Sequence, residues 1–133
     1  MSADRATYLD SSAIVKLIVA EPESAALRRY LRVRRPLVSS ALARAEVARA
    51  LLAFGDQALR RSQDVLGRIE LIRISDRILA AAGALLPSEL RTLDAIHLAT
   101  AQQLGSDLAR IVTYDERMRA AAAAVGARVA APA

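Results

Sequence analysis

Short apolar runs alternate along the chain with longer stretches in which apolar residues recur at helical spacing. Four of the short runs predict buried strands: 6–10 (ATYLD), 37–40 (LVSS), 71–75 (LIRIS) and 110–114 (RIVTY). The segment 127–131 (ARVAA) has the pattern of a closing edge strand. We therefore expect a sheet of short strands, separated in the sequence by longer helical segments.

The segments between these strands have the periodicity and the end signals of helices. We expect helices at 12–20, 22–35, 41–53, 56–69, from Ser75 or Asp76 onward, 92–104 and 116–125. Pro22 opens the second helix, which ends before Pro36 because proline disfavours a helical conformation in the residue that precedes it. Glycines at 55, 105 and 126 stop three of the others.

This order of elements predicts the fold class. Strands separated by helices pair in parallel, and the helices then cover both faces of the sheet. We expect an α/β fold, a three-layer α/β/α domain with a central parallel sheet. The helix at 92–104 is apolar on nearly every side, which is typical of a buried helix. With 133 residues, 54% of them hydrophobic, the chain can bury one core, and we expect residues 1–133 to form a single domain.

Composition excludes several kinds of chemistry. The sequence has no cysteine, which rules out disulfide scaffolds, zinc–thiolate sites, iron–sulfur clusters and thiol nucleophiles. A reaction that needs paired histidines is excluded too, because His97 is the only histidine. Phosphate-binding glycine loops, dinucleotide-binding fingerprints and hydrolase nucleophile elbows are missing. No stretch is apolar enough to cross a bilayer and the start lacks the order of a secretory signal, so we expect a cytoplasmic protein with no membrane partner.

The formal net charge is +5, and the basic residues are eighteen arginines and one lysine. Such a surface attracts polyanions and suits bidentate contacts with phosphates, so nucleic acid is the natural partner. A bias of the source genome toward arginine and alanine would explain the same composition. The basic run from Arg28 to Arg35 could contact RNA or could be a solvated helix face.

Four acidic residues occupy positions that suit a shared site. Asp10 and Asp115 follow predicted strands, at the carboxyl edge where open α/β sheets gather their reactive groups. Asp94 lies in the first turn of the buried helix, where the helix dipole favours a negative charge. Glu46 comes one turn after Leu42, so it can project from the edge of the core-facing stripe of its helix. All four could reach one crevice.

Each of these acids also has a local structural explanation. Asp10 and Asp115 could be helix N-caps, and Asp94 could cap its own helix beside Thr92. Glu46 could be a solvated residue, paired three positions along its helix with an arginine.

Two further residues limit what local reasoning can decide. Asp76 follows a predicted strand in the same pattern as Asp10, and local physics does not separate the two. His97 lies one turn after Asp94 and could support that carboxylate through a hydrogen bond, or it could be a satisfied core histidine.

If the carboxylates meet, their repulsion raises their pKa values unless a cation lies between them. Oxygen ligands favour a hard ion, Mg²⁺ or Mn²⁺. Such an ion activates a bound water and neutralises charge on a phosphodiester transition state, so the pattern indicates a metal-dependent nuclease. The arginines would collect the nucleic acid strand, and the acids would hold the metal at the scissile phosphate.

Four sequence segments, in order, resemble PIN-domain ribonucleases, and specifically the VapC-type toxins of type II toxin–antitoxin pairs. They are YLDSSAIVKLIVAEPES, SSALARAEVARAL, LRTLDAIHLATAQQLG and IVTYDERM, and the resemblance spans nearly the whole chain. It implies a compact α/β/α fold and Mg²⁺- or Mn²⁺-dependent endonucleolytic cleavage of RNA. It also implies a homodimer and a cognate VapB-type antitoxin whose tail enters the active-site groove.

The resemblance assigns roles to the acids. Asp10, Glu46, Asp94 and Asp115 match the family's four acidic positions, whereas Asp76 matches none of them. The match implies that Asp10 and Asp94 are primary metal ligands and that Glu46 and Asp115 complete the site directly or through water. Hydroxyls from Ser12 and Thr113 stand at positions where the family often has them.

Two other functions stay open at this stage. A metal-dependent nuclease acting on DNA would use the same acids, although the chain contains nothing that looks like an added duplex-binding module. A non-catalytic Mg²⁺-binding regulatory domain of the receiver type would need an acidic pocket beside a lysine. Lys16 is the only lysine, and its position after the first strand suits that role poorly.

Overall fold

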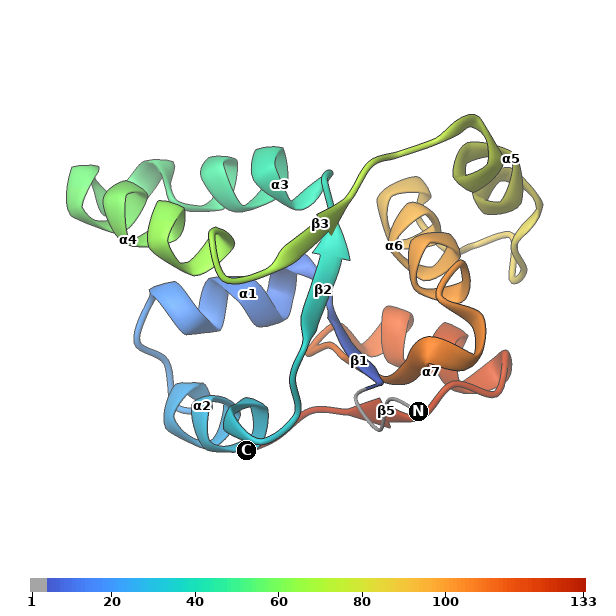
Figure 1. The fold of residues 1–133 in the computed structure, drawn as a ribbon. Helices are drawn as coiled ribbons and strands as arrows, with labels where there is room; N and C mark the ends of the chain where they lie inside the picture. The colour runs from blue at the N-terminus through green and yellow to red at the C-terminus, as the bar shows by residue number, and fades with distance from the viewer. Residues whose placement is uncertain (1–4) are drawn as a thin grey trace.

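The computed structural model describes residues 5–133, which form a parallel sheet between two groups of helices (Figure 1). The strands are β1 (Ala6–Leu9), β2 (Leu37–Ser40), β3 (Glu70–Ile72), β4 (Leu108–Val112) and β5 (Val129–Ala130). They are ordered β3-β2-β1-β4-β5, and every neighbouring pair is parallel. Residues 1–4, which the single-domain prediction includes, lie outside the described part of the chain.

The helices follow the predicted order with shorter bounds. They are α1 (Ser11–Ile18), α2 (Ser24–Arg32), α3 (Ala43–Ala50), α4 (Asp56–Leu66), α5 (Asp76–Ala84), α6 (Thr92–Gln102) and α7 (Glu116–Ala124). The stretch expected as one helix at 41–53 is divided into α3 and a 3₁₀ turn at Leu52–Phe54. The helix expected at 22–35 ends early, because the Arg34 N–H bonds to the Leu31 carbonyl and tightens the chain into a turn before Pro36.

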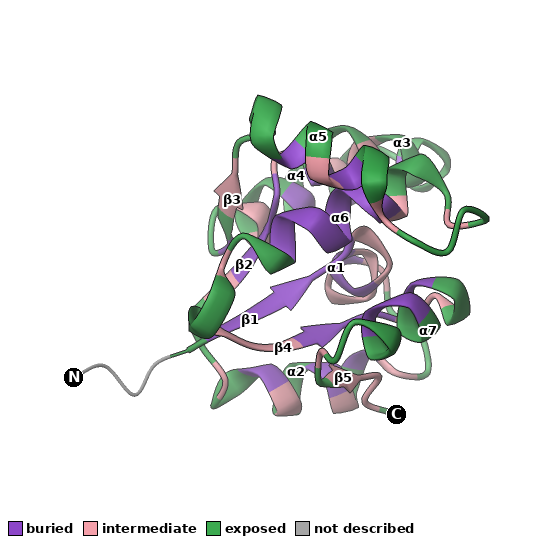
Figure 2. Cartoon of the chain, turned by 90° about the vertical axis from the view of Figure 1, so that its right-hand side faces the viewer, coloured by how far each residue is buried: buried purple, intermediate pink, exposed green. Residues whose placement is uncertain are grey.

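The two faces of the sheet bury two separate cores, so the predicted three-layer α/β/α architecture is confirmed. On one face, Leu9 and Val112 pack against α1 to α4. On the other, Tyr8 and Ile111 pack against α6 and α7, while α5 packs on the outside of α6. Successive residues of β1 and β4 thus point to opposite layers, as the pleat of a strand requires. Figure 2 shows β1 buried along its whole length and β4 buried over its carboxyl-terminal part.

Helix α6 is the buried helix that its sequence predicts. All residues from Ala95 to Ala101 are buried, and the helix lies between the sheet and α5. Asp94 is half-buried in its first turn, directly before this buried stretch. A carboxylate is therefore held at the rim of the core, in the first turn of a buried helix.

The strand order creates a switch point between β1 and β4. The chain passes from β1 to β2 and β3 on one side and returns to β4 and β5 on the other. The helices that follow β1 and β4 therefore leave the sheet on opposite faces, α1 on one and α7 on the other. Open α/β sheets bind their ligands in the crevice outside the carboxyl ends of such strands.

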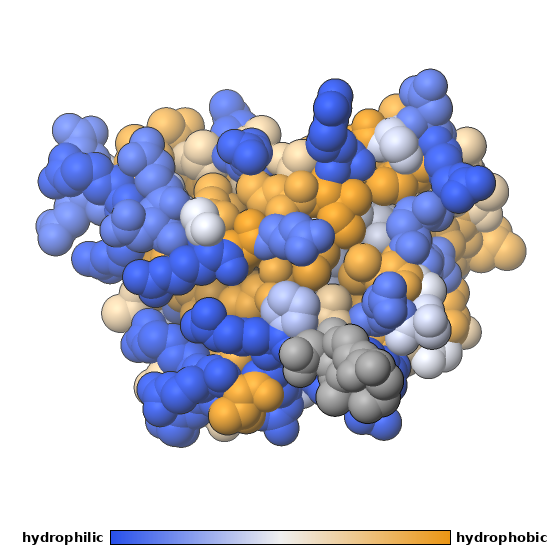
Figure 3. Space-filling view, in the orientation of Figure 1, coloured by the Kyte–Doolittle hydropathy of each residue, from blue (hydrophilic) through white to orange (hydrophobic). Residues whose placement is uncertain are grey.

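The surface carries many hydrophilic side chains around an apolar area over the β2–β3 edge (Figure 3). From the basic run, Arg28, Arg32 and Arg35 are exposed and line a cleft of about 230 Å³ together with Arg68. This cleft lies at the amino end of β2, so it opens at the sheet edge opposite the carboxyl ends. No helix within residues 5–133 is both long and apolar enough to span a bilayer.

Candidate functional site

Asp10 lies immediately after β1 and is 3% exposed. It caps α1, with Oδ1 accepting the Ala13 N–H at 3.1 Å. The Ser12 hydroxyl donates to the same oxygen at 2.6 Å, and the Thr113 hydroxyl donates to Oδ2. Burial raises the pKa of Asp10, and these hydrogen bonds to the charged form offset part of the rise. The helix-cap interpretation is therefore correct for Asp10, and it leaves the site interpretation open.

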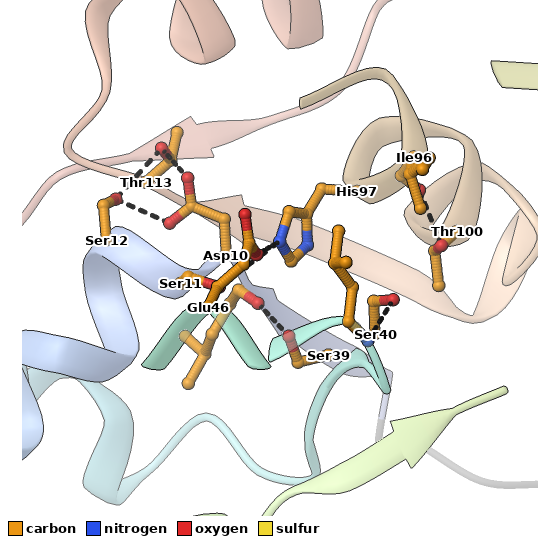
Figure 4. A network of polar contacts seen from close by, with 12 residues as sticks. Asp10, Ser11, Ser12, Ser39, Ser40, Glu46, Ile96, His97, Thr100 and Thr113 are labelled. Atoms are coloured by element: carbon orange, nitrogen blue, oxygen red, sulfur yellow. Dashed lines mark hydrogen bonds and ion pairs between the residues drawn. The ribbon is translucent and has the colours of Figure 1, made fainter. Parts of the chain in front are cut away.

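Two hydroxyl groups join the end of β1 to the segment that follows β4. Ser12 Oγ accepts the Tyr114 N–H at 3.0 Å, and Thr113 Oγ1 accepts the Asp115 N–H at 3.1 Å. Both hydroxyls therefore donate to Asp10 (Figure 4). Ser12 crosses to the other segment as an acceptor, and Thr113 crosses to it as a donor. We call this arrangement of Ser12 and Thr113 the hydroxyl clasp. It fixes the Asp10 carboxylate relative to the backbone of Asp115 across the switch point.

Asp115 is half-buried and caps α7. Its Oδ1 accepts the Arg117 N–H at 2.9 Å and the Met118 N–H at 3.0 Å. The cap interpretation is thus correct here as well. Within residues 5–133, its other carboxylate oxygen has no hydrogen bond. Asp115 can therefore cap its helix with one oxygen and keep the second for another partner.

Asp94 behaves differently, because it caps nothing. The N-cap position of α6 is Arg91, without a side-chain cap, so neither Thr92 nor Asp94 fills the capping role that the sequence allowed. Burial raises the pKa of Asp94, and the negative charges of Asp115 and then Asp10 raise it further. Asp94, expected to share a crevice with Asp115 and Asp10, is therefore near enough to both for their charges to act on it.

Glu46 projects from the first turn of α3, and its side chain is 21% exposed. Its Oε1 accepts a hydrogen bond from Ser11 Oγ at 2.5 Å and lies 2.6 Å from His97 Nε2. Burial alone would raise the pKa of Glu46, but the hydrogen bonds from His97 and Ser11 leave it below its ordinary value. Within residues 5–133, Glu46 contacts His97 and forms no ion pair with Arg49, so the alternative of a pairing along its own helix is not realised.

His97 is 2% exposed and is bonded at both ends of its ring. Its Nδ1 lies 2.7 Å from the Tyr8 hydroxyl, on the opposite side from Glu46. Of the two alternatives for His97, the hydrogen bond to Asp94 is not formed, and the buried histidine with both ring nitrogens satisfied is confirmed. Periodicity placed His97 and Asp94 on one helix face, but only the tertiary structure, which brings Glu46 of α3 and Tyr8 of β1 to His97, could identify these partners.

Asp76 is separated from the other acids by the sheet order. It is exposed in the first turn of α5, and Ser75 caps that helix through the Ile78 N–H at 3.2 Å. The strand before it, β3, forms the edge of the sheet, two positions from β1. A strand followed by an acid thus occurs here without the switch point that brings Asp10 and Asp115 together.

The donor set fits a hard divalent cation. Asp10, Asp94, Asp115 and Glu46 offer carboxylate oxygens, the ligands that a hard cation prefers. As the side chains stand, no three His, Cys, Asp or Glu residues in the range 5–133 form the close group of a preformed metal centre. The acids share one electrostatic environment, and which of them touch a metal stays a prediction.

Comparison with known proteins gives a consistent result. The PIN domain family model matches residues 7–124. The chain is 65% identical over 127 residues to Ribonuclease VapC46 of Mycobacterium tuberculosis, covering 96% of this chain and 98% of the relative. It is 44% identical over 129 residues to Ribonuclease VapC35 of the same species, covering 94% and 96% respectively.

The fold is also found among solved structures. The crystal structure of VapC20 from Mycobacterium tuberculosis, described as a toxin that cleaves the sarcin–ricin loop, superposes with a TM-score of 0.74. The match covers 95% of this chain and 99% of VapC20 at 15% identity, so it supports the fold alone. Together with the family match over residues 7–124, the identity to two VapC ribonucleases over nearly the whole chain shows that this chain belongs to the PIN domain family and, within it, to the VapC ribonucleases.

Proposed function

We propose that this protein is a Mg²⁺-dependent endoribonuclease, with Mn²⁺ as an alternative ion, and the toxin of a VapBC-type toxin–antitoxin pair. The observation that carries the proposal is that Asp10 and Asp115 are joined by the hydroxyl clasp at the switch point, with Asp94 near enough for their charges to raise its pKa beyond the effect of burial. Carboxylates that repel one another at the carboxyl ends of strands are a charge arrangement that a divalent cation stabilises. The relatives named as ribonucleases support RNA as the substrate.

In this proposal Asp10 and Asp94 hold the cation, and Glu46 and Asp115 complete the site directly or through water. A bound divalent ion supplies charge neutralisation at the scissile phosphate and lowers the pKa of water. The chain's own contribution is orientation. The hydrogen bonds of the hydroxyl clasp favour the charged form of the buried Asp10 carboxylate. They also fix its orientation, because each of its two oxygens accepts one of them.

The partners follow from the same charge distribution. The net charge of +5 favours a polyanion such as RNA, and the acidic crevice then requires a cation to admit a phosphate. An antitoxin that presents an arginine or lysine to the same crevice would neutralise the carboxylates in place of the metal. We propose a VapB-type antitoxin as this partner and a homodimer as the assembled form of the toxin.

The test is cleavage of structured RNA by the purified protein in Mg²⁺ or Mn²⁺, with and without EDTA. We expect cleavage to stop in EDTA and to be abolished by Asp94→Asn, while a DNA substrate of the same sequence stays intact. Persistent cleavage in EDTA would end the proposal. Cleavage of the DNA, and not the RNA, would favour the other metal-dependent nuclease function.

Asp76→Asn is the matched control, because Asp76 begins a helix after a strand but lies at the far edge of the sheet. We expect full activity from this variant. In bacteria, induced expression of the wild type and of Asp10→Ala, with mapping of RNA ends, would identify the target. New RNA ends common to both proteins would argue against Asp10 as a catalytic residue.

A further inference from the structure

We propose that His97 is a positioning residue for Glu46. The Tyr8 hydroxyl holds the imidazole ring at Nδ1, and Nε2 fixes one carboxylate oxygen of Glu46, so that the other oxygen stays available to the active site. This inference rests on the proposed function. It starts from a chain of contacts in which the Tyr8 hydroxyl lies 2.7 Å from Nδ1 of the ring and Glu46 Oε1 lies 2.6 Å from Nε2.

The direction of the hydrogen bonds follows from the groups involved. An ionised carboxylate only accepts, so Nε2 of His97 carries a hydrogen and donates to Glu46. In the neutral ring Nδ1 then accepts, and the Tyr8 hydroxyl is its donor. A tyrosine hydroxyl is protonated at neutral pH, so it can donate to Nδ1. The fully buried Tyr8 ring therefore sets the tautomer of His97.

The two carboxylate oxygens of Glu46 differ in their hydrogen bonds. Oε1 receives hydrogen bonds from both Ser11 and His97, whereas Oε2 makes none within residues 5–133. In the view of Figure 4 the Glu46 carboxylate lies between His97 and Asp10. A flexible glutamate side chain is thereby held in one orientation, with the unbonded oxygen available to a cation or water.

The network also joins the two helical layers at the carboxyl edge of the sheet. Glu46 belongs to α3, which packs with α1 on one face. His97 belongs to α6, which covers the other face, and Tyr8 is one of the β1 residues that point to that face. The position of Glu46 relative to Asp94 on α6 therefore depends on His97, because Asp94 and His97 lie one turn apart on the same helix.

A purely structural histidine would account for the burial of His97 but not for a catalytic effect that depends on which ring nitrogen is replaced. The test uses this distinction. In His97→Gln the side-chain amide can reach the Nε2 position and donate to Glu46, whereas in His97→Asn the shorter amide reaches only the Nδ1 position next to Tyr8. Both variants leave a polar group in the same cavity, so their stabilities are comparable controls.

We expect His97→Asn to lower kcat for RNA cleavage by about 10–100-fold with little change in KM, and to weaken Mn²⁺ affinity by a similar factor. Mn²⁺ binding is measured by the electron paramagnetic resonance signal of the free ion, which does not depend on catalysis. His97→Gln should stay within about threefold of the wild type in both measurements, since it restores the donor. In a Glu46→Gln background, His97→Asn should cause no further loss.

Each result has a defined meaning. Equal loss in the two His97 variants, or loss that follows their melting temperatures, would show a merely structural role and overturn the inference. Wild-type protein that binds Mn²⁺ but cleaves no RNA would refute the proposed function, while the Mn²⁺ arm still tests the positioning of Glu46. Wild-type protein that neither binds Mn²⁺ nor cleaves RNA would overturn the inference together with the proposed function. If His97→Asn does not fold, Tyr8→Phe takes its place. Weaker Mn²⁺ binding by Tyr8→Phe supports the positioning of Glu46 by His97, and unchanged binding overturns it.

Discussion

Replacing Thr113 with valine tests whether the hydroxyl clasp maintains the buried charge of Asp10. Valine has nearly the shape of threonine, so Thr113→Val leaves the packing of this fully buried site intact and deletes one hydroxyl. The deletion removes the hydrogen bond donated to Asp10 Oδ2 and the acceptor of the Asp115 N–H. Asp10 is 3% exposed, so water cannot readily replace the lost donor.

The magnitude follows from the charge on the acceptor. A hydrogen bond to a charged group contributes about 1.5–3 kcal/mol, so Thr113→Val should lower the free energy of unfolding by roughly that amount at pH 7. For a chain of this length the melting temperature should fall by roughly 5–12 °C. Thr113→Ser, which keeps the hydroxyl and loses a methyl group, should lose clearly less.

The pH dependence gives a second check on the cause. The Thr113 hydrogen bond favours the ionised form of Asp10, so its contribution is present where Asp10 is charged. Burial raises the pKa of Asp10 in the folded state, and the contribution is lost as the pH falls through that raised value. The difference in melting temperature between wild type and Thr113→Val should therefore shrink on acidification.

The assay is thermal unfolding in EDTA at a series of pH values, followed by circular dichroism. A shift for Thr113→Val below about 2 °C at pH 7 would refute the reasoning. So would a shift that does not depend on pH, or an equal shift in Thr113→Ser, because neither follows from loss of a hydrogen bond to a carboxylate. RNA cleavage by Thr113→Val should fall by about 10–100-fold, as for other residues that orient a metal ligand.

Two other predictions address electrostatics and packing. Asp94→Asn should melt at the same or a higher temperature than wild type in EDTA, because the pKa of Asp94 is raised by burial and by the charges of Asp115 and Asp10. Because the pKa of Asp94 is raised in the folded state, ionised Asp94 destabilises the fold at pH 7, and this cost disappears as acid protonates the group. The gain in stability of Asp94→Asn over wild type, measured as the urea midpoint, should therefore be largest at pH 7 and shrink on acidification. Lower stability of Asp94→Asn at pH 7 would contradict this prediction. Leu98→Ala deletes a fully buried side chain between α6 and the sheet and should destabilise the fold by about 2–5 kcal/mol. Below its melting temperature Leu98→Ala should keep wild-type Mn²⁺ affinity, and a weakened affinity would mean that the α6 core also positions the site.

Sequence reasoning was strongest where the pattern is local and repetitive. The strand runs and helical stretches occur in the predicted order, and the uninterrupted apolar face of α6 correctly indicated a buried helix. Element ends were less well predicted, because turns such as the one at Arg34 depend on hydrogen bonds that periodicity does not contain. The glycine at 126 was read correctly, since its positive φ of 85° at the end of α7 strongly favours glycine.

The acids show the limit of local reasoning. For Asp10 and Asp115 both interpretations were available from the sequence, and the structure makes them helix caps that also lie at the switch point. Asp76 has the same local pattern and lies elsewhere, because β3 is an edge strand. Among the features of the sequence, only the ordered resemblance to PIN-domain ribonucleases separates Asp76 from Asp10 and Asp115.

By itself the sequence therefore determined the class of fold, the buried helix and the acidic residues available for chemistry. These properties depend on spacing along one segment, which the order of residues records directly. The tertiary structure decided the contacts between segments: the hydroxyl clasp on Asp10, the bond between His97 and Glu46, and the repulsion that Asp94 receives from Asp115. The hydrogen bond from Thr113 to Asp10 spans 103 positions and the bond between His97 and Glu46 spans 51, and their geometry exists only once the sheet order has brought the strand ends together.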